Sequence, residues 1–361
     1  MPSISASCFD LLCSVLFDPS EKASAAGWKC QRLALFSNSV ALGELQSLAS
    51  MNHVIMRAYP KLCSSLPDGA QSSAARALVL SMKKEVARIH YAIPFLHDIC
   101  QALESAGNVI VIKSLDHWPD LGSDLDLYTD ATPGAIVDTM RKAFQAQVEK
   151  QSWGDRLANK WNFVVPELPE LVEVHIGRLG QTGEQRAIGE SLVKRSVYRE
   201  VDGYRFRVPA AEERVVISAL QRMFRHFYIR LCDVLEIAQL MGAGLDYDYL
   251  HRLTQPSGLW NGVATYLRII SEYVQLRRGL ALPLPEFART AARFGSEKVE
   301  YRKAFLRIPI MPHSAKLYIS ELGSLVSGGE ISDSLRLSLL PALATAAAIK
   351  QSITNSDKGI W

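Results

Sequence analysis

The run of residues 109–112 (Val-Ile-Val-Ile) constrains the fold of this 361-residue chain most strongly. Four consecutive β-branched residues are typical of a strand that is buried on both faces. Lys113 and Ser114 end the run, in a position to meet phosphate oxygens. A short loop then leads to Gly122 and Ser123, after which a second strand-like segment begins. We therefore predict two successive strands joined by a loop of small and polar residues.

The second segment carries two aspartates, Asp124 and Asp126, separated by one residue. Because side chains alternate along a strand, both carboxylates lie on one face, and Leu125 and Leu127 lie on the other. Two carboxylates this close repel each other unless a cation lies between them, and Mg²⁺ is commonly held by carboxylates together with substrate phosphates. The pattern predicts a site for magnesium and a nucleotide. A solvated turn is the alternative for an isolated Asp-x-Asp pair.

Periodicity divides the chain into three regions and predicts an α+β fold. Residues 1–106 have helical spacing, residues 107–208 contain the strands, and residues 209–361 are mostly helical again. A helix is expected at 133–150. The predicted strands are 109–113, 123–129, 161–165, 171–177 and a hairpin over 198–208 that turns at Asp202-Gly203.

A long helix is predicted over residues 209–240, because Pro209 and two glutamates precede an apolar stripe of helical period. Arg222, His226, Arg230 and Asp233 follow one another at helical spacings and are expected on one side of it. A phosphate-binding face and a merely solvated charged face are both compatible with this pattern.

These residues resemble nucleotidyltransferases of the DNA polymerase beta-like fold. That family combines a hydrophobic strand, a Gly-Ser pair and, about ten residues later, Asp-x-Asp on the next strand. Here Lys113-Ser114 stands in the Gly-Ser place and Asp124-Leu-Asp126 follows. The chain is most similar to a bacterial branch of uncharacterised nucleotidyltransferases, in which the first strand ends in Leu-Lys-Gly, so that Ser114 replaces a glycine. The resemblance spans roughly residues 25–250 and implies a polymerase beta-like palm as the small mixed sheet.

The resemblance also implies a third acidic residue on a neighbouring strand. Residues 171–176 alternate apolar and polar side chains and carry Glu173 and His175 on one face, which matches the acidic-x-His strand of the branch. Glu173 is therefore expected as the third metal ligand or the general base, beside Asp124 and Asp126. A structural histidine is an equal alternative for His175.

The expected activity is magnesium-dependent transfer of a nucleotidyl group from a nucleoside triphosphate, with release of pyrophosphate. Mn²⁺ is the alternative ion. Asp124, Asp126 and Glu173 are the expected catalytic and metal-binding residues. The acceptor is expected to be a small molecule, peptide or protein. The expected nucleotide-binding residues are Lys113, Ser114, Gly122, Ser123, His175, Arg178, His226 and Arg230.

Two other functions remain compatible with the sequence. One is a nucleotide-binding or toxin–antitoxin type interaction module that has kept the fold without turnover, and the other is a phosphotransferase that uses the same metal site. Analysis of the products distinguishes these functions from nucleotidyl transfer. A binding module releases nothing, a phosphotransferase transfers phosphate, and a nucleotidyltransferase releases pyrophosphate.

Composition narrows the partners and the compartment. A formal net charge of +3 is too small to argue for a nucleic-acid partner. The six cysteines, including Cys30, have no metal-ligand spacing and are expected to be buried thiols in a reducing cytoplasm. The longest apolar stretch, residues 339–349, is too short to span a bilayer, so no membrane partner is expected.

Overall fold

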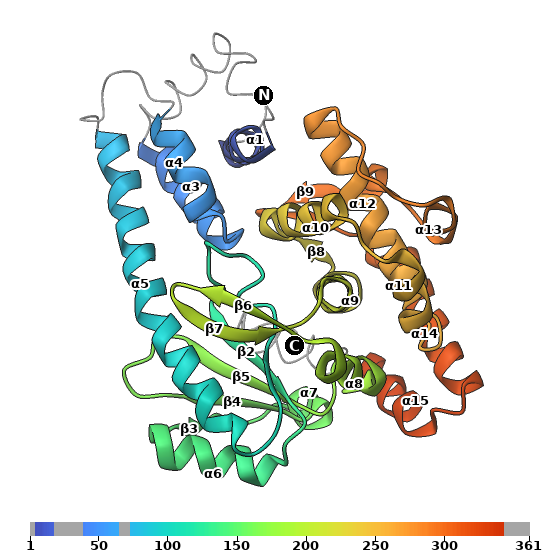
Figure 1. Cartoon of the computed structure of the whole chain (residues 1–361). Coiled ribbons are helices and arrows are strands. Elements are labelled where there is room, and N and C mark those ends of the chain that lie inside the picture. Colours follow the sequence, from blue (N-terminus) through green and yellow to red (C-terminus); the bar gives the residue numbers. More distant parts are fainter. Residues whose placement is uncertain (1–3, 18–38, 65–72, 343–361) are drawn as a thin grey trace.

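Figure 1 shows the computed structural model of the chain, which describes residues 4–17, 39–64 and 73–342. A small sheet lies at the lower left, the N-terminal helices rise above and in front of it, and the C-terminal helices form the right-hand side. The predicted α+β class is therefore confirmed. Cys30 and most of the apolar stretch 339–349 lie outside the described residues.

The central sheet has five strands in the order β1-β2-β5-β4-β3. β2 and β5 are parallel, and the other neighbouring pairs are antiparallel, so the sheet is mixed as predicted. The strands are β1 (Val109–Val111), β2 (Asp124–Thr129), β3 (Gln147–Val148), β4 (Lys160–Val164) and β5 (Leu171–Ile176).

One face of this sheet is apolar and packs against helices α5 (Ser73–Glu104) and α6 (Pro133–Phe144). Leu127 of β2 and Val174 of β5 are fully buried there, together with Ile93 of α5 and Met140 of α6. Burial of such aliphatic side chains supplies roughly 1.5–3 kcal/mol each. The polar side chains that alternate with them are consequently held on the opposite face.

The opposite face is partly covered by α8 (Arg186–Arg195) and α9 (Ala211–Ala219). Tyr128 of β2 lies in this second core, and Gly189 of α8 lies directly against its ring. An added Cβ at Gly189 would overlap the Tyr128 hydroxyl, so a glycine is required for α8 to approach the sheet this closely. The part of the face beyond this contact is left open for the polar side chains.

The predicted strands and hairpin are found within one or two residues at each end. The hairpin consists of β6 (Val197–Val201) and β7 (Tyr204–Val208), paired in register across Asp202 and Gly203. Both turn residues have positive φ, of 51° and 80°, as a two-residue turn of the primed type requires. The predicted helix at 133–150 ends earlier, at Phe144, because Gln145 adopts a left-handed conformation and β3 follows.

The single helix predicted over 209–240 is wrong. α9 continues into a π-helical segment, η1 (Leu220–His226), and the helix ends at Phe227, whose φ is 54°. The chain then forms strand β8 (Tyr228–Ile229) before α10 (Leu231–Ala243) begins. β8 pairs with β10 (Phe305–Arg307), which in turn pairs with β9 (Glu300–Arg302).

The N-terminal and C-terminal helices share one hydrophobic core. Phe17 of α1 packs edge-on against Tyr273 of α12, and Phe9 stacks on Tyr301 of β9 at 4.2 Å between ring centroids. The N-terminal helices are α1 (Ile4–Phe17), α3 (Ser39–Met51) and α4 (Ile55–Ser64). The later segments are α7 (Trp153–Ala158), α11 (Tyr247–Thr254), α12 (Trp260–Arg278), α13 (Glu286–Ala291), η2 (Ser296–Lys298), η3 (Ile310–Ser314), α14 (Ala315–Ser327) and α15 (Ile331–Ser338).

A buried ion-pair triad ties the loop after β1 to α9 and α10. Arg214 of α9 binds Asp116 of the loop at 2.8 Å from Nε to Oδ1, and it also binds Glu236 of α10. Burial raises the pKa of Glu236 to about 7, and Asp116 adds to the rise against the opposing charge of Arg214. One guanidinium therefore serves two buried carboxyl groups.

The cysteines in the described ranges are all free thiols. Four of them are buried, as the sequence predicted, whereas Cys63 is only half-buried. None of the helices in those ranges is both long and apolar enough to cross a membrane.

Candidate active site

The open face of the central sheet carries the three predicted carboxylates. Asp126 of β2 lies directly beside Glu173 of β5, and Asp124 is two residues earlier on the same face. The register also brings His175 onto this face, since it is paired with Tyr128 and with Lys160 of β4. The alternation argued from the sequence thus positions all of these groups, because Leu125 and Leu127 occupy the apolar face.

Two lysines form ion pairs with this acidic cluster. The Lys113 ammonium lies between Asp126 and Glu173, in contact with Asp126 and 3.5 Å from Glu173 Oε1. Lys160 binds Glu173 Oε2 at 3.0 Å and Asp155 at 2.9 Å. Lys113 has a φ of 62°, and this left-handed turn at the end of β1 directs its backbone out of the strand.

The protonation states of the cluster differ from residue to residue. Burial raises the pKa of Asp126, and the neighbouring Glu173 and Asp124 carboxylates add to the rise, against the effect of Lys113. Burial also favours a raised pKa for Glu173, but Lys113, His175 and Lys160 outweigh it and together hold the pKa of Glu173 well below its usual range. Burial lowers the pKa of His175 to about 4, so the ring is neutral at pH 7 and Nε2 donates to Glu173 Oε1 at 2.8 Å.

The donor set of this cluster fits a hard divalent ion. Carboxylate oxygens of Asp126 and Glu173 lie within 4.8 Å of each other, and Asp124 lines the same cavity. A ring nitrogen of His175 is equally close, but its Nε2 carries the hydrogen donated to Glu173, so the oxygens are the ligands on offer. Carboxylate oxygens are the ligands that Mg²⁺ prefers. The Lys113 ammonium occupies the point between Asp126 and Glu173. A metal ion would therefore have to displace this ammonium or bind beside it, closer to Asp124.

Ser114 is buried and its hydroxyl is engaged with the backbone of β2. Its Oγ accepts a hydrogen bond from the Asp126 N–H at 2.7 Å and donates to the Asp124 carbonyl at 3.1 Å. The hydroxyl therefore fixes the loop after β1 against the strand that carries both aspartates. Gly122 and Ser123 lie on the rim of the same cavity.

A basic wall faces the acidic cluster across a cavity of about 250 Å³. Arg225 and His226 of η1 and Arg230 after β8 line it. Among the described residues, neither Arg225 nor Arg230 forms an ion pair with a carboxylate; the side chain of Arg230 instead contacts His53 Nε2 at 2.8 Å. Arg222, by contrast, is fully buried and pairs with Asp233 at 2.7 Å. Two guanidinium groups are thus available for an anionic ligand.

The break at Phe227 is what arranges this wall. A continuous helix would spread Arg222, His226 and Arg230 along more than two turns of one side, whereas the π-helical segment followed by β8 folds them around a single cavity. The Arg222–Asp233 pair closes the turn, because Asp233 also accepts from the Arg230 N–H at 2.7 Å. Arg222, His226 and Arg230 are therefore grouped as predicted, but by a π-helical segment and a strand rather than by one continuous helix.

Two histidines that the sequence analysis missed complete the cavity. His53 lies between α3 and α4, and His117 lies in the loop after β1; their rings stack at 6.2 Å. Burial lowers the pKa of both well below the usual range, with Arg230 the next cause for His53 and Arg222 for His117. His53 is far from the motif in sequence, so no local pattern points to it.

Arg225 and Lys160 were also missed, although each had a signal. Arg225 follows Arg222 in a basic segment of the predicted helix, and Lys160 begins the strand that pairs with β5. The structure does not bring Arg178 to the cavity. Its guanidinium binds Asp333 of α15 at 2.5 Å and the Gly183 carbonyl at 3.0 Å, so it joins a loop to the C-terminal helices.

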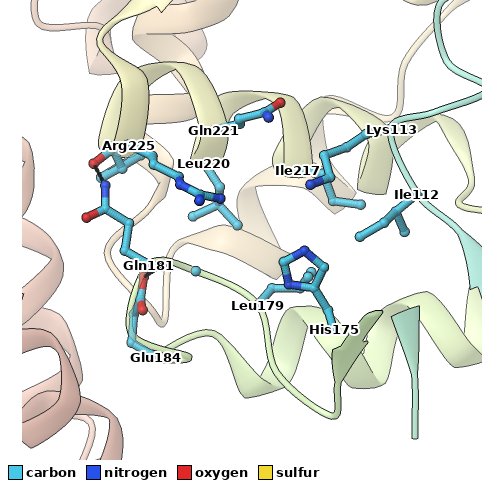
Figure 2. A pocket seen from close by; sticks show the side chains of 12 residues that line it. Ile112, Lys113, His175, Leu179, Gln181, Glu184, Ile217, Leu220, Gln221 and Arg225 are labelled. Carbon is cyan, nitrogen blue, oxygen red and sulfur yellow. Dashed lines mark hydrogen bonds between the residues drawn. The ribbon is translucent and has the colours of Figure 1, made fainter. Parts of the chain in front are cut away.

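A smaller cavity of about 40 Å³ adjoins the site on the far side of Lys113. Figure 2 shows His175 pointing into it toward the helix that carries Ile217 and Gln221, with Ile112 on one side. The Nδ1 atom of His175 has no hydrogen-bond partner among the described residues. His175 therefore lines the smaller cavity, with Nε2 on Glu173 and Nδ1 turned away from that carboxylate.

Comparison of the chain with protein-family models, with curated protein sequences and with solved structures gives no match. The geometry of the site is consequently the basis for any assignment of function.

Proposed function

We propose that the protein is a magnesium-dependent nucleotidyltransferase of the polymerase beta-like superfamily. The observation that carries the proposal is the opposition of charges across one cavity: Asp124, Asp126 and Glu173 on its floor face Arg225 and Arg230, which have no carboxylate partner among the described residues. A metal-bound triphosphate complements both sides of such a cavity: its metal cation suits the carboxylates, and its phosphate oxygens suit the guanidinium groups.

In this proposal the basic wall binds the triphosphate. Arg225 and Arg230 donate to phosphate oxygens, and the neutral His226 beside them donates one further hydrogen bond. Ser114 acts by holding Asp124 and Asp126 in position rather than by contacting phosphate, because its hydroxyl is already shared with the β2 backbone.

Asp124, Asp126 and Glu173 would hold Mg²⁺, which when bound polarises the phosphoryl oxygens. Of the two roles expected for Glu173, ligand is favoured over general base, since the low pKa imposed by Lys113, His175 and Lys160 makes it a weak proton acceptor. In the reaction an acceptor oxygen bonds to the α-phosphorus, the bond to pyrophosphate breaks, and the acceptor proton passes to a carboxylate of the site or to water.

A nucleotide-binding module without turnover is the second candidate, and one observation favours it. The Lys113 ammonium lies between Asp126 and Glu173, where it supplies positive charge without a divalent ion. In that case the cavity would bind a nucleotide through Arg225 and Arg230 alone.

The test is transfer of label. The protein is incubated with Mg²⁺ and an extract as the source of acceptor, using each nucleoside triphosphate labelled at the α-phosphate and, in parallel, at the γ-phosphate. The Asp124→Asn/Asp126→Asn variant is compared with Asp138→Asn, a matched change at an exposed position on α6. Binding of a non-hydrolysable triphosphate analogue is measured on the same three proteins.

Transfer of α-label that the double variant loses and Asp138→Asn retains would support the proposal. Transfer of γ-label with the same dependence would indicate a phosphotransferase. Binding of the analogue without transfer of either label would favour the binding module, and failure to bind the analogue would overturn both candidates.

A further inference from the structure

The three-stranded sheet β8-β10-β9 adjoins the candidate active site, because Tyr228 of β8 lines its cavity and Arg230 directly follows this strand. Residues paired across antiparallel strands share a face, and side chains alternate along each strand, so the register sorts the sheet into two faces. One face packs against the hydrophobic core and carries Ile229, Leu306 and Tyr301. The other, which we call the outer face, carries Tyr228, Arg307, Phe305, Arg302 and Glu300.

The outer face continues the basic wall of the cavity. Arg302 is exposed, and Arg307 is partly exposed. With Lys303 in the turn between β9 and β10, and with Arg225 and Arg230 on the wall, the region has five basic side chains against one carboxylate, that of Glu300. Among the described residues, none of the five forms an ion pair with a carboxylate. The small net charge of the whole chain therefore conceals a local excess of positive charge.

Aromatic rings hold the guanidinium groups of this face in place. Tyr228 and Phe305 stack at 4.3 Å between ring centroids. The guanidinium carbon of Arg307 lies 5.0 Å from the Tyr228 centroid and 5.5 Å from the Phe305 centroid, and that of Arg230 lies 5.8 and 5.9 Å from them. Such contacts leave the N–H groups at the edge of a guanidinium free to donate. Within the described ranges Arg307 uses only Nε, which donates to the Arg302 carbonyl at 3.4 Å.

The outer face extends beyond the phosphates of one nucleotide. Adjacent strands lie about 4.8 Å apart, so Arg307 on β10 and Arg302 on β9 lie about 5 and 10 Å further from the cavity than Tyr228. In the proposed function Arg225 and Arg230 already bind the triphosphate. The two additional arginines fit further phosphate groups in a row, and the partly exposed rings of Tyr228 and Phe305 offer surfaces on which bases stack.

A single-stranded nucleic acid combines these two features. Its backbone supplies successive phosphates, and its bases are free to stack on aromatic rings and guanidinium planes. In a duplex the bases are stacked on one another and do not reach such rings. An acidic peptide would match the charge of the outer face but would leave the aromatic rings without a stacking partner.

We propose that the outer face binds a single-stranded nucleic acid whose end lies in the cavity of the candidate active site. Phosphates contact Arg302 and Arg307, and bases stack on Tyr228 and Phe305. The role of this end as the acceptor rests on the proposed function, whereas binding of the strand does not. As the acceptor, its terminal hydroxyl oxygen bonds to the α-phosphorus, the bond to pyrophosphate breaks, and the hydroxyl proton passes to a carboxylate of the site or to water.

The experiment measures binding to the full chain by fluorescence anisotropy at several salt concentrations. The labelled probes are a short RNA and a DNA single strand of the same sequence, the corresponding DNA duplex, and polyglutamate. Arg302→Gln/Arg307→Gln is compared with Arg141→Gln/Lys142→Gln, which removes the same charge from two exposed positions on α6. Arg302→Gln alone, at an exposed position, serves as a second variant if the double variant does not fold, as judged by circular dichroism.

At least one single strand is expected to bind the wild type and the α6 variant equally, and more tightly than the duplex or polyglutamate. Arg302→Gln/Arg307→Gln should lower the affinity by roughly tenfold or more, because two charged hydrogen-bond donors are lost. It should also reduce the slope of log K against log salt by about 1.4, since each phosphate contact to a single strand contributes about 0.7. Absence of single-strand binding, equal binding by all variants, or equally tight binding of polyglutamate would overturn the inference.

The label-transfer assay, with the same single strands added as acceptors, separates this failure from that of the proposed function. If α-label is transferred from a nucleoside triphosphate but strand binding is absent or insensitive to Arg302 and Arg307, the nucleic-acid surface is wrong and the activity stands. If a strand binds in the expected way and no label is transferred to any acceptor, the surface stands and the nucleotidyltransferase proposal falls.

Discussion

Replacement of Lys113 by methionine is the most informative perturbation of the acidic cluster. The change keeps most of the side-chain length and removes the ammonium that lies between Asp126 and Glu173. All three side chains are at most 15% exposed, so the lost pair is largely shielded from water. Breaking a buried ion pair by removing one partner typically costs about 3–5 kcal/mol of unfolding free energy.

Two features of the structure reduce that cost. Glu173 keeps its contacts with Lys160 and His175, and Asp126 is able to take up a proton, since burial already raises its pKa. Loss of Lys113 raises the pKa of Asp126 further above its unfolded value. The destabilisation should therefore be small near pH 6, where Asp126 is protonated, and reach about 1–3 kcal/mol near pH 8, where the charge has to be carried without a partner.

The assay is urea unfolding of wild type, Lys113→Met and Lys142→Met, near pH 6 and near pH 8, with EDTA or with excess Mg²⁺. Lys142 is exposed on α6 and controls for loss of a positive charge. Mg²⁺ is expected to stabilise Lys113→Met more than wild type, because the ammonium no longer competes; at a hundredfold excess over the dissociation constant the gain is about 2.7 kcal/mol. Equal stability of the three proteins in EDTA near pH 8 would refute the reasoning, and an absence of any Mg²⁺ effect on Lys113→Met would refute the metal site.

Three further predictions concern the cavity and the core. Arg225→Ala should weaken binding of a non-hydrolysable triphosphate by roughly tenfold or more, measured by calorimetry, while the exposed Arg186→Ala leaves it unchanged; equal affinities would contradict the basic wall. His53 and His117 have lowered pKa values that a bound triphosphate should raise, so affinity should increase as the pH falls and binding should take up protons, which calorimetry in buffers of different ionisation enthalpy detects. The folded pKa of Glu236, about 7, is above its unfolded value, so the stability it confers is fully present only below the unfolded pKa and is lost as the pH rises through the folded one; Glu236→Gln should be about 1–3 kcal/mol more stable than wild type near pH 8 and close to it near pH 4, by denaturant unfolding.

The acidic cluster was predictable because most of its geometry depends on local pattern. Alternation along 124–127 and 171–176 determines which side chains share a face, and the apolar residues between them determine which face is buried. The same holds for the hairpin turn at Asp202-Gly203, where both residue types tolerate positive φ. Only the pairing of β2 with β5 needed more than the local sequence, and the order of motifs in the resembled family suggested it.

The basic wall was predictable only in composition. His226 and Arg230 were identified and Arg225 was missed, and all were expected on a continuous helix, because apolar spacing over 209–240 satisfies the helical period throughout. What interrupts the helix is long-range: the Phe227 carbonyl accepts from the Ile308 N–H at 2.9 Å, and β8 pairs with β10 about eighty residues later. A local pattern contains no information about such a partner, and the same limitation hid His53.

The two halves of the candidate site consequently depend on different parts of the chain. The acidic floor belongs to the sheet and its position is fixed by strand register, whereas the basic wall depends on the β8–β10 pairing and on the Arg222–Asp233 ion pair. Arg222 and Asp233 are 1% and 2% exposed, so loss of either leaves a buried charge without a partner. A change there should move Arg225 and Arg230 without touching the carboxylates, and would therefore separate binding of the triphosphate from binding of the metal. Loss of triphosphate binding with retained metal binding would show that the site is assembled from two elements. Loss of both together would show that it is built as one unit on the sheet.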